Sequence, residues 1–413
     1  MSQLSQASQV SLARKASPTP AAGLSESQAA QWVAAMASQL AQAQAQAQAQ
    51  GKSFAIEGHN SKAFYGEPVG GEQARLLTTD YAGVVSYDPT ELVVVARSGT
   101  AIAELENLLA QKGQRLAFEP PRFGGKGTVG GMVATGLSGP GRLSAGACRD
   151  FVLGMTIMNA QGELLRFGGT VMKNVAGYDL SRLHTGALGT LGLILDVALK
   201  VLPEPAATAT VCIDCSQAKA IEDSNLWMAE PLPLSATAFE QAEPEAALGR
   251  LSLRFSGAKV AVSAALELFI SRRGAQVLPE PAAQAFWLSL RDQTHRFFQP
   301  EASFSKLSLW RLSLPASTPA LASLQDEPRG CLLEWAAGLR WVWSAKPAAQ
   351  MQQLAQDHGG HATLYRPAES VTDPKLAPRF TPLGPVLHRL HVRLKNELDP
   401  QRVFNPGRLY PSL

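Results

Sequence analysis

The chain has 413 residues, of which 37 are Lys or Arg and 34 are Asp or Glu, so its formal net charge is +3. Charged residues make up 17% of the sequence, against about 25% in a typical soluble domain. So small a net charge argues against the basic field of a nucleic-acid-binding protein, and the length suggests two or three domains at roughly 150 residues each.

The first 22 residues are polar, small and proline-containing, and we expect them to form a disordered tail. They lack the basic and apolar regions of a secretory signal, and no run of about 18 apolar residues follows, which predicts a cytoplasmic protein. Residues 25–50 predict one amphipathic helix with Ser25 or Ser27 as its cap. Its apolar residues recur at helical spacing at Trp32, Val33, Met36 and Leu40.

Short strand-like runs and helices follow each other from residue 54 to residue 201, each bounded by turn-forming residues. The predicted strands are residues 54–57, 83–87, 92–96, 152–159, 163–167 and 193–201. The predicted helices are residues 100–111 and 179–183. A proline-rich break, LPEPAA from Leu202, closes this unit and predicts a domain boundary.

Beyond the break, residues 206–385 predict a smaller α+β domain. Its strand-like runs are residues 251–255, 307–314 and 331–343, and residues 258–272 predict a helix between them. The end of the chain, HRLHVRLKNELDPQRVFNPGRLYPSL, predicts an amphipathic helix that stops at Asp399 and Pro400, followed by a turn-rich tail.

Glycine is concentrated in one stretch, because seventeen of the 35 glycines lie between Gly124 and Gly192. This indicates either repeated turns with positive φ or a backbone pressed against a ligand. The segment FGGKGTVGGMVATGLSGPG lacks the G-K-[ST] of a Walker loop, and no G-x-G-x-x-G opens an amphipathic helix between two strands. We therefore expect a long extended path whose N–H groups, with the hydroxyls of Thr128, Thr135 and Ser138, bind a large ligand.

A second turn, Gly58-His59-Asn60-Ser61-Lys62, directly follows a predicted strand. Its small polar residues and main-chain amides are typical of an anion-binding nest. One nest and one long glycine path together suit a dinucleotide with a pyrophosphate group.

The two segments resemble the FAD-binding domain of the vanillyl-alcohol oxidase/p-cresol methylhydroxylase type. More closely, GHNSKAFYG, YDPTELVVVARSGT, RFGGTVMKNVAGYDLSRL, LWRLSLP, GGHATLYR and DPQRVFNPGRLYP resemble the FAD-binding subunits of glycolate oxidases, from about residue 26 to the end. The resemblance implies an α+β fold. The implied fold consists of a two-subdomain FAD-binding domain (residues 23–205), a smaller α+β cap domain (206–385), and a C-terminal helix and tail (386–413) packed back on the FAD domain.

The resemblance also implies which residues bind FAD. The loop over the pyrophosphate would be Gly58, His59, Asn60, Ser61 and Lys62. The path around the ribityl chain and flavin would be Pro120, Thr128, Val129, Gly130, Gly131, Ala134, Thr135, Gly136, Gly139 and Arg142. Gly146 and Asp150 would lie near the pyrophosphate or adenosine end, and the adenine side would be Thr190, Leu191, Gly192 and Ile194. The flavin ring would lie beside Lys173, Asn174, Val175, Ala176, Gly177, Tyr178 and Asp179.

Simpler interpretations stay open for single residues. A single glycine can be required merely for a turn with positive φ and not for ligand binding. Asp150 can be a turn cap, and Tyr178 can be a core tyrosine. Some flavoproteins of this fold bond FAD covalently to a histidine placed like His59. The glycolate oxidase subunits do not require that histidine, so we expect non-covalent FAD.

The sequence does not fix a catalytic residue. It lacks the H-x-G-D-G-N-x-H stretch that binds a metal in related 2-hydroxy-acid dehydrogenases. The nearest segment, residues 358–361 (HGGH), predicts a helix end, a turn and a strand start, so no metal site is expected. Weak catalytic candidates are Tyr178, Arg311 and Arg340. Each arginine stands among aromatic residues, either to clamp a carboxylate or to stack on tryptophan as a structural residue.

The four cysteines, Cys148, Cys212, Cys215 and Cys331, lack iron–sulfur spacing, and no redox or metal role is expected for the single C-x-x-C. The resemblance implies an FAD-binding subunit of a complex that oxidises glycolate, a 2-hydroxy acid, to glyoxylate. It would work beside a homologous catalytic flavoprotein subunit and an iron–sulfur subunit, in the cytoplasm or on the inner face of the cell membrane through the complex. A self-sufficient FAD-dependent 2-hydroxy-acid oxidoreductase and a non-catalytic scaffold subunit are the alternatives.

Overall fold

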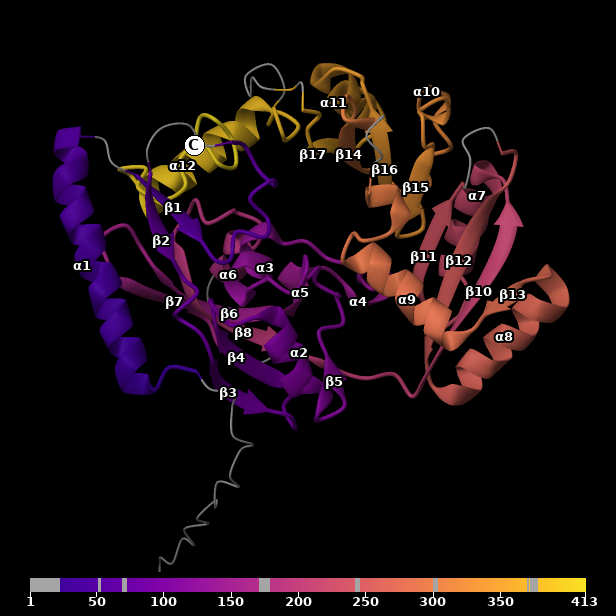
Figure 1. Cartoon of the computed structure of the whole chain (residues 1–413), viewed down its shortest axis with the longest axis horizontal. Coiled ribbons are helices and arrows are strands. Elements are labelled where there is room, and N and C mark those ends of the chain that lie inside the picture. Colours follow the sequence, from indigo (N-terminus) through magenta and orange to yellow (C-terminus); the bar gives the residue numbers. More distant parts are fainter. Residues whose placement is uncertain are drawn as a thin grey trace, which may run out of the picture.

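A computed structural model describes residues 23–50, 53–68, 73–170, 179–241, 246–299, 304–369, 371 and 378–413. The predicted tail of residues 1–22 lies outside them. The chain then opens with the long helix α1 (Glu26–Gln50), at the left edge of Figure 1. Ser25 and Gln28 exchange hydrogen bonds between side chain and main chain, so Ser25 is the predicted cap. Trp32 stacks on Tyr81 at 4.7 Å between ring centroids, which fixes the helix to the domain.

In the described part of the first half, a parallel pair of strands and a larger sheet frame the glycine-rich region. Strands β1 (Phe54–Glu57) and β2 (Ala74–Leu77) pair in parallel. An antiparallel sheet of five strands follows, in the order β3 (Val84–Asp88), β4 (Val93–Arg97), β8 (Leu193–Lys200), β6 (Val152–Met158) and β7 (Leu164–Gly168). Helix α2 (Ile102–Ala110) buries Ile102, Leu105, Leu108 and Leu109 against it. The predicted strands and helix of this half are therefore confirmed.

The glycine-rich region differs from the extended path that its composition predicts. Between residues 124 and 151 it forms the short helices α3 (Val129–Thr135), α4 (Arg142–Ala145) and α5 (Cys148–Phe151). Helix α3 forms because Thr128 caps its first turn and Gly136, at φ 61°, ends it in the left-handed conformation. Further along, Asp179 caps the short helix α6 (Leu180–His184), which was predicted.

The second half is built on one antiparallel sheet, which in the described part of the chain has eight strands (Figure 1). Its order is β13 (Gln276–Leu278), β10 (Ala207–Cys215), β12 (Gly249–Gly257), β11 (Leu234–Glu240), β15 (Cys331–Glu334), β16 (Leu339–Ser344), β14 (Ser308–Ser313) and β17 (His361–Arg366). Its helices are α7 (Gln217–Met228), α8 (Lys259–Arg273), α9 (Glu280–Arg291), η1 (Arg296–Phe298), α10 (Ala322–Gln325) and α11 (Ala348–Asp357). The two-residue strands β5 (Gln114–Arg115) and β9 (Leu202–Pro203) pair with each other, and β9 directly precedes β10 in the chain.

One prediction for this half is wrong. Residues 331–343 form two strands, β15 and β16, and not one. The turn between them contains Trp335, Ala336 and Ala337 at φ 55°, 52° and 68°. These residue types give no turn signal, because left-handed backbone is expected of Gly, Asn or Asp.

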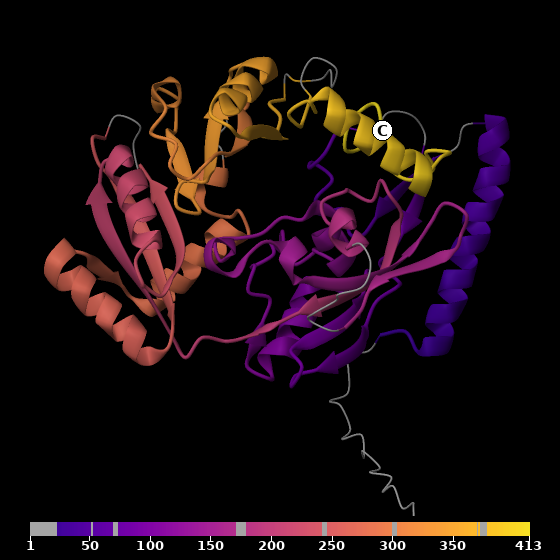
Figure 2. The ribbon, with the colours of Figure 1, turned by 180° about the vertical axis from the view of Figure 1, so that it is seen from behind.

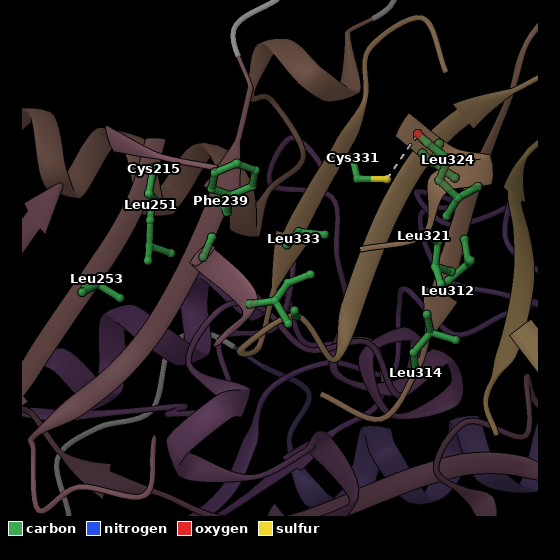
Figure 3. Close-up of a cluster of buried hydrophobic side chains, with 14 of the residues drawn as sticks. Cys215, Phe239, Leu251, Leu253, Leu312, Leu314, Leu321, Leu324, Cys331 and Leu333 are labelled. Atoms are coloured by element: carbon green, nitrogen blue, oxygen red, sulfur yellow. Dashed lines mark hydrogen bonds between the residues drawn. The ribbon is translucent and has the colours of Figure 1, made fainter. Parts of the chain in front are cut away.

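The two faces of the eight-stranded sheet carry different side chains, since successive residues of a strand point to opposite faces. One face packs a mainly aliphatic cluster, here called the aliphatic cluster, against helices α7, α8 and α11. Figure 3 shows part of it, including Leu253, Leu312 and Leu333. The other face carries an aromatic cluster that includes Trp341 and Tyr365, and it packs on residues of the first half such as Phe64. The aromatic face therefore lies on the side of the sheet that is directed to the first half and its glycine-rich region.

Ion pairs and hydrogen bonds hold the two halves together. Arg254 of β12 pairs with Glu119 at 2.9 Å, and Arg291 at the end of α9 pairs with Glu106 of α2. The indole N–H of Trp335 donates to the Gly139 carbonyl at 3.1 Å. The aromatic face is thus fixed against the glycine-rich region.

The last helix, α12 (Pro385–Leu398), and the residues after it lie on the first half of the molecule, in yellow in Figures 1 and 2. Lys395 is fully buried and donates to Asp399 at 2.7 Å and to the Thr190 carbonyl at 2.6 Å. Asp399 also accepts the main-chain N–H groups of Val403 and Phe404, at 2.9 Å each. This buried pair anchors the end of the chain beside β1.

Candidate functional site

The turn after β1 forms one wall of an open pocket, here called the loop pocket. Its lining residues are Ile56, Glu57, Gly58, His59, Asn60, Ser61, Lys62, Ala63, Tyr65, Thr128, Gly131, Ala134, Thr135, Leu188, Asn405 and Arg408. Asn60 has a left-handed φ of 58°. Among the described residues, the N–H groups of residues 59–62 donate to no protein acceptor. Consecutive free N–H groups beside a left-handed residue form a concave donor site for an anion.

Helix α3 forms the opposite wall, and two glycines keep the pocket open. A Cβ on Gly58 would lie 2.8 Å from Thr128 Oγ1, closer than real Cβ atoms approach. A Cβ on Gly131 would lie 3.2 Å from the same oxygen and 3.5 Å from Lys62 Cε. Thr128 is itself fixed, since its hydroxyl accepts the Gly131 N–H at 3.2 Å. Side chains at these two positions would therefore close the space between the turn and α3.

Lys62 supplies the positive charge of the loop pocket. Burial lowers the pKa of its ammonium group to about 8. The group lies 5.5 Å from the centre of the Phe123 ring and donates a long 3.4 Å hydrogen bond to Ser61 Oγ. No carboxylate of the described residues pairs with it, so the charge is available to an anion in the pocket.

The end of the chain completes the loop pocket. Asn405 accepts the Ile56 N–H at 2.8 Å and donates to the Leu188 carbonyl at 2.7 Å, which joins β1 to the segment before β8. Arg408 donates to the carbonyls of Glu67 at 2.8 Å and Tyr65 at 2.7 Å, and so holds the chain that leaves the turn. Neither residue is a predicted site residue. Both lie in the string FNPGRLYP, which was noted only for its resemblance.

The structure brings nine of the predicted cofactor residues together in the loop pocket. They are Gly58, His59, Asn60, Ser61, Lys62, Thr128, Gly131, Ala134 and Thr135. Lys173, Asn174, Gly177 and Tyr178 lie outside the described residues, as do Val175 and Ala176.

Several glycines of the predicted path face the protein itself. A Cβ on Gly139 would lie 2.5 Å from the Glu119 carbonyl oxygen, and one on Gly141 would lie 2.6 Å from that of Ala117. Gly130 is packed in the same way, 2.7 Å from Ser98 Cβ. Glycine is needed at these positions because chain segments pack closely there. Composition alone cannot distinguish such packing from contact with a ligand.

The other predicted residues have local roles in the described chain. Asp150 is exposed and accepts the Ala147 N–H at 2.9 Å, which is a turn cap beside Gly146 at φ 101°. The Pro120 carbonyl accepts Arg291 Nε at 2.9 Å. The remaining residues are buried or partly buried: Val129, Gly136, Arg142, Thr190, Leu191, Gly192 and Ile194.

The two arginine candidates point to opposite faces of the eight-stranded sheet. Arg340 is buried with its guanidinium bonded to the carbonyls of Thr318, Pro319 and Ala337. That arrangement favours a structural role. Arg311 lies on the aromatic face, 5.3 Å from the Trp335 ring centre, and lines a second, smaller cavity between the halves.

The histidine and cysteine residues show no metal-binding arrangement. His358 ends α11, Gly359 follows at φ 72° and His361 begins β17, as predicted. All four cysteines are buried, and burial raises the pKa of the Cys215 thiol to about 11. In the part of the chain that the structure describes, no three His, Cys, Asp or Glu residues are grouped to hold a metal ion. No helix there has the length and apolar content needed to cross a membrane.

Comparison with known proteins identifies the domain and the family. Residues 31–168 match the family model of an FAD binding domain. The glycolate oxidase subunit GlcE of Escherichia coli (strain K12) is 41% identical over 358 residues, which cover 87% of this chain and 93% of the relative. The glycolate oxidase subunit GlcD of Bacillus subtilis (strain 168) is 32% identical over 31% of this chain and 27% of its own. A D-lactate dehydrogenase of Anaerostipes hadrus is 37% identical over 32% of this chain and 27% of its own.

The fold has a solved counterpart. An alkyldihydroxyacetonephosphate synthase structure superposes with a TM-score of 0.59 at 16% identity, over 87% of this chain and 72% of its own. The expected α+β fold with an FAD-binding domain of the p-cresol methylhydroxylase type is confirmed. The free amides and the unpaired lysine of the loop pocket fit the diphosphate of FAD. The chain belongs to the GlcE family of glycolate oxidase subunits, and FAD is its cofactor.

Proposed function

We propose that the chain is the FAD-binding subunit of an assembly that oxidises glycolate to glyoxylate and passes the electrons to partner subunits. The observation that carries the proposal is the similarity to GlcE, which extends over both halves of the molecule and 93% of that relative. Shorter matches, such as the D-lactate dehydrogenase, share about a third of this chain. The 2-hydroxy acid is the substrate class common to these names.

In this proposal the loop pocket holds the diphosphate of FAD. The N–H groups of residues 59–62 would donate to its oxygens, and the Lys62 ammonium would balance its charge. Thr128, Gly131, Ala134 and Thr135 would line the next part of the cofactor. FAD, when bound, supplies the two-electron chemistry of alcohol oxidation, while the chain supplies binding and orientation. His59 is exposed, and we propose that FAD binds without a covalent bond to it.

We further propose that a homologous flavoprotein and an iron–sulfur protein complete the assembly. The cysteines of this chain support a separate iron–sulfur subunit. Cys148 lies in the core of the first half, and Cys215 and Cys331 lie in the aliphatic cluster of the second (Figure 3). Buried thiols spread over two cores lack the grouped arrangement that holds an iron–sulfur cluster. Any contact with a membrane would be made through the complex.

Reconstitution tests the proposal. The purified chain is mixed with its homologous flavoprotein and iron–sulfur partners, and glycolate-dependent dye reduction is measured with and without FAD in this chain. We expect full activity to require the FAD-loaded chain, and the chain alone to give little. Full activity with an FAD-free chain would instead establish a scaffold role. Rapid dye reduction by the chain alone would establish a self-sufficient enzyme.

A further inference from the structure

A second cavity, here called the interdomain cavity, lies between the glycine-rich region and the aromatic face of the sheet. The cavity is small, and Leu137, Ser138 and Gly139 form its wall on the FAD-domain side. Arg311, Glu334, Trp341 and Tyr365 form most of the sheet side. They come from the four neighbouring strands β14, β15, β16 and β17.

Arg311 brings an unpaired positive charge to the interdomain cavity. Its exposed fraction is 9%, and its guanidinium lies 5.3 Å and 5.8 Å from the ring centres of Trp335 and Trp341. Among the described residues, it has no hydrogen-bond acceptor and no carboxylate in ion-pair contact. Arg291, which lines the same cavity, is by contrast paired with Glu106. A buried guanidinium without a partner is costly unless an anion joins it.

Glu334 lies near Arg311 but is not in ion-pair contact with it. It is 4% exposed, and one of its carboxyl oxygens accepts the Trp341 indole N–H at 2.8 Å. Burial raises the pKa of this carboxyl group to about 7, although nearby Arg311 opposes the rise. Near neutral pH much of Glu334 is therefore protonated. A protonated carboxyl group can donate a hydrogen bond to a ligand oxygen.

A second arginine adds to the positive field. Arg142, in the FAD domain, lies 4.4 Å from the centre of the Trp335 ring, the same ring that Arg311 contacts at 5.3 Å. Burial, and then the charge of Arg311, lowers the pKa of Arg142 to about 10. Neither arginine forms an ion pair with an acid of the described residues. Their charges favour an anion over a neutral ligand in the space beside them.

We propose that the interdomain cavity binds a small carboxylate, with Arg311 holding the carboxylate group and Glu334 the oxygen on the neighbouring carbon. The geometry alone points to a small carboxylate. The choice of a 2-hydroxy acid as the natural ligand rests on the proposed function. The cavity lies directly beside Leu137, Ser138 and Gly139, which follow α3 and the loop pocket in the chain. The proposal therefore gives this subunit its own substrate-class site next to its cofactor path.

The test measures binding of oxalate to the full chain loaded with FAD, by isothermal titration calorimetry. Oxalate presents a carboxylate and an oxygen on the next carbon, and it has no C–H bond to oxidise. We expect saturable binding at pH 6.5 and none with oxamide, its neutral diamide. Arg311→Met should weaken oxalate binding by at least about 30-fold, because it removes one partner of a buried charged contact. Glu334→Gln should retain binding but remove its decline between pH 6 and pH 8.

Matched variants separate this inference from a folding defect and from the proposed function. Arg250→Met removes an exposed arginine of the same sheet that pairs with Asp214, and it should bind oxalate like the wild type. Arg311→Lys keeps the charge and should recover part of the affinity lost in Arg311→Met. Unchanged oxalate binding in Arg311→Met, or no binding in the wild type, overturns the inference. Since each sample is loaded with FAD first, failure to bind oxalate leaves cofactor binding intact and contradicts only the interdomain cavity.

Discussion

The loop pocket and the interdomain cavity are built from different parts of the chain. The loop pocket offers main-chain N–H groups, small residues and one lysine, and its shape depends on missing Cβ atoms. The interdomain cavity offers buried charged and aromatic side chains from four strands. A ligand in the first is held mainly by the path of the backbone, and a ligand in the second by the identity of side chains.

This difference determines which substitutions matter in each place. Apart from Lys62, removing a polar side chain should disturb the loop pocket little, while adding a methyl group should disturb it strongly. The reverse should hold for the interdomain cavity, where volume is set by large aromatic residues and specificity by two ionisable groups.

The largest effect is expected for Asp399→Ala, which removes the anchor of the segment that completes the loop pocket. Lys395 would be left buried without its acid, and the N–H groups of Val403 and Phe404 would lose their acceptor. Breaking a buried pair in this way costs about 3–5 kcal/mol. Urea unfolding should show that loss, together with weaker FAD retention.

Glu397→Ala is the matched control for this variant, because Glu397 is an exposed acid on the same helix. Its free energy of unfolding should stay within about 0.5 kcal/mol of the wild type. Equal stabilities for the two variants would show that the buried pair does not anchor the C-terminal segment.

The interdomain cavity predicts a pH-dependent stability that Glu334→Gln abolishes. The pKa of Glu334 is about 7 in the folded chain, above its usual 4.5, chiefly because of burial; the Trp341 hydrogen bond and Arg311 oppose the rise, and the Glu119 charge adds to it. The folded chain thus keeps this proton longer than the unfolded chain. Stability from this group is full below pH 4.5 and falls as pH rises to about 7, by roughly 3 kcal/mol.

Urea unfolding of wild type and Glu334→Gln at pH 5 and pH 8 measures this difference. We expect the variant to gain stability relative to the wild type at pH 8 and to gain little at pH 5. A gap between the two proteins that is the same at both pH values would mean that Glu334 is ionised throughout and that the interdomain cavity holds a permanent anion.

The loop pocket predicts that Gly58→Ala weakens FAD binding without unfolding the chain. The added methyl group would lie 2.8 Å from Thr128 Oγ1 and push the turn away from α3. Overpacking of this size costs about 1–3 kcal/mol, and if that cost falls on the bound state the dissociation constant for FAD should rise by about 5-fold to 150-fold.

Gly384→Ala is the control for added volume. Its Cβ would meet no atom within 4 Å, and its φ of −61° suits alanine. FAD titrations followed by flavin fluorescence should show wild-type affinity for this variant. Equal affinity in Gly58→Ala would contradict the placement of the cofactor in the loop pocket.

The smallest effect is expected for His59→Ala. The side chain is exposed, and the site uses the main-chain N–H of His59 and not its ring. FAD affinity should change by less than about twofold, as for a surface substitution. Acid precipitation should release all yellow colour from both proteins. Colour that stays with wild-type protein but leaves His59→Ala would establish a covalent histidine bond.

Local pattern predicted the elements of the FAD domain because strand and helix periods are short-range properties. The turn Gly58–Lys62 was recognised from five consecutive residues. The roles of single glycines could not be predicted from local sequence, because the atoms that approach Gly139 belong to Glu119, which lies 20 residues earlier in the chain. Asn405 and Arg408 were missed for the same reason, since they reach β1 and its turn from the far end of the chain.

Only the register of strands β14 and β16 distinguishes the roles of the two candidate arginines. Arg311 and Arg340 have similar aromatic neighbours in sequence, and both were carried as weak candidates. Alternation along β14 and β16 places Arg311 on the face toward the FAD domain and Arg340 on the aliphatic face. Glu334 was not selected, because residues 331–343 were predicted as one strand and the hairpin that places it was not foreseen.

The most direct test of the loop pocket is the FAD affinity of Lys62→Met, measured from pH 7 to pH 9 beside Lys259→Met, an exposed control. The free Lys62 ammonium has a pKa of about 8, and a bound diphosphate would raise it. Its contribution to affinity is therefore full below pH 8 and is lost as pH rises. We predict that wild type and Lys259→Met bind FAD more weakly at pH 9 than at pH 7, while Lys62→Met binds about tenfold more weakly at pH 7 and shows little further loss. Identical affinities and pH profiles for all three proteins would contradict a loop pocket that holds the diphosphate of FAD.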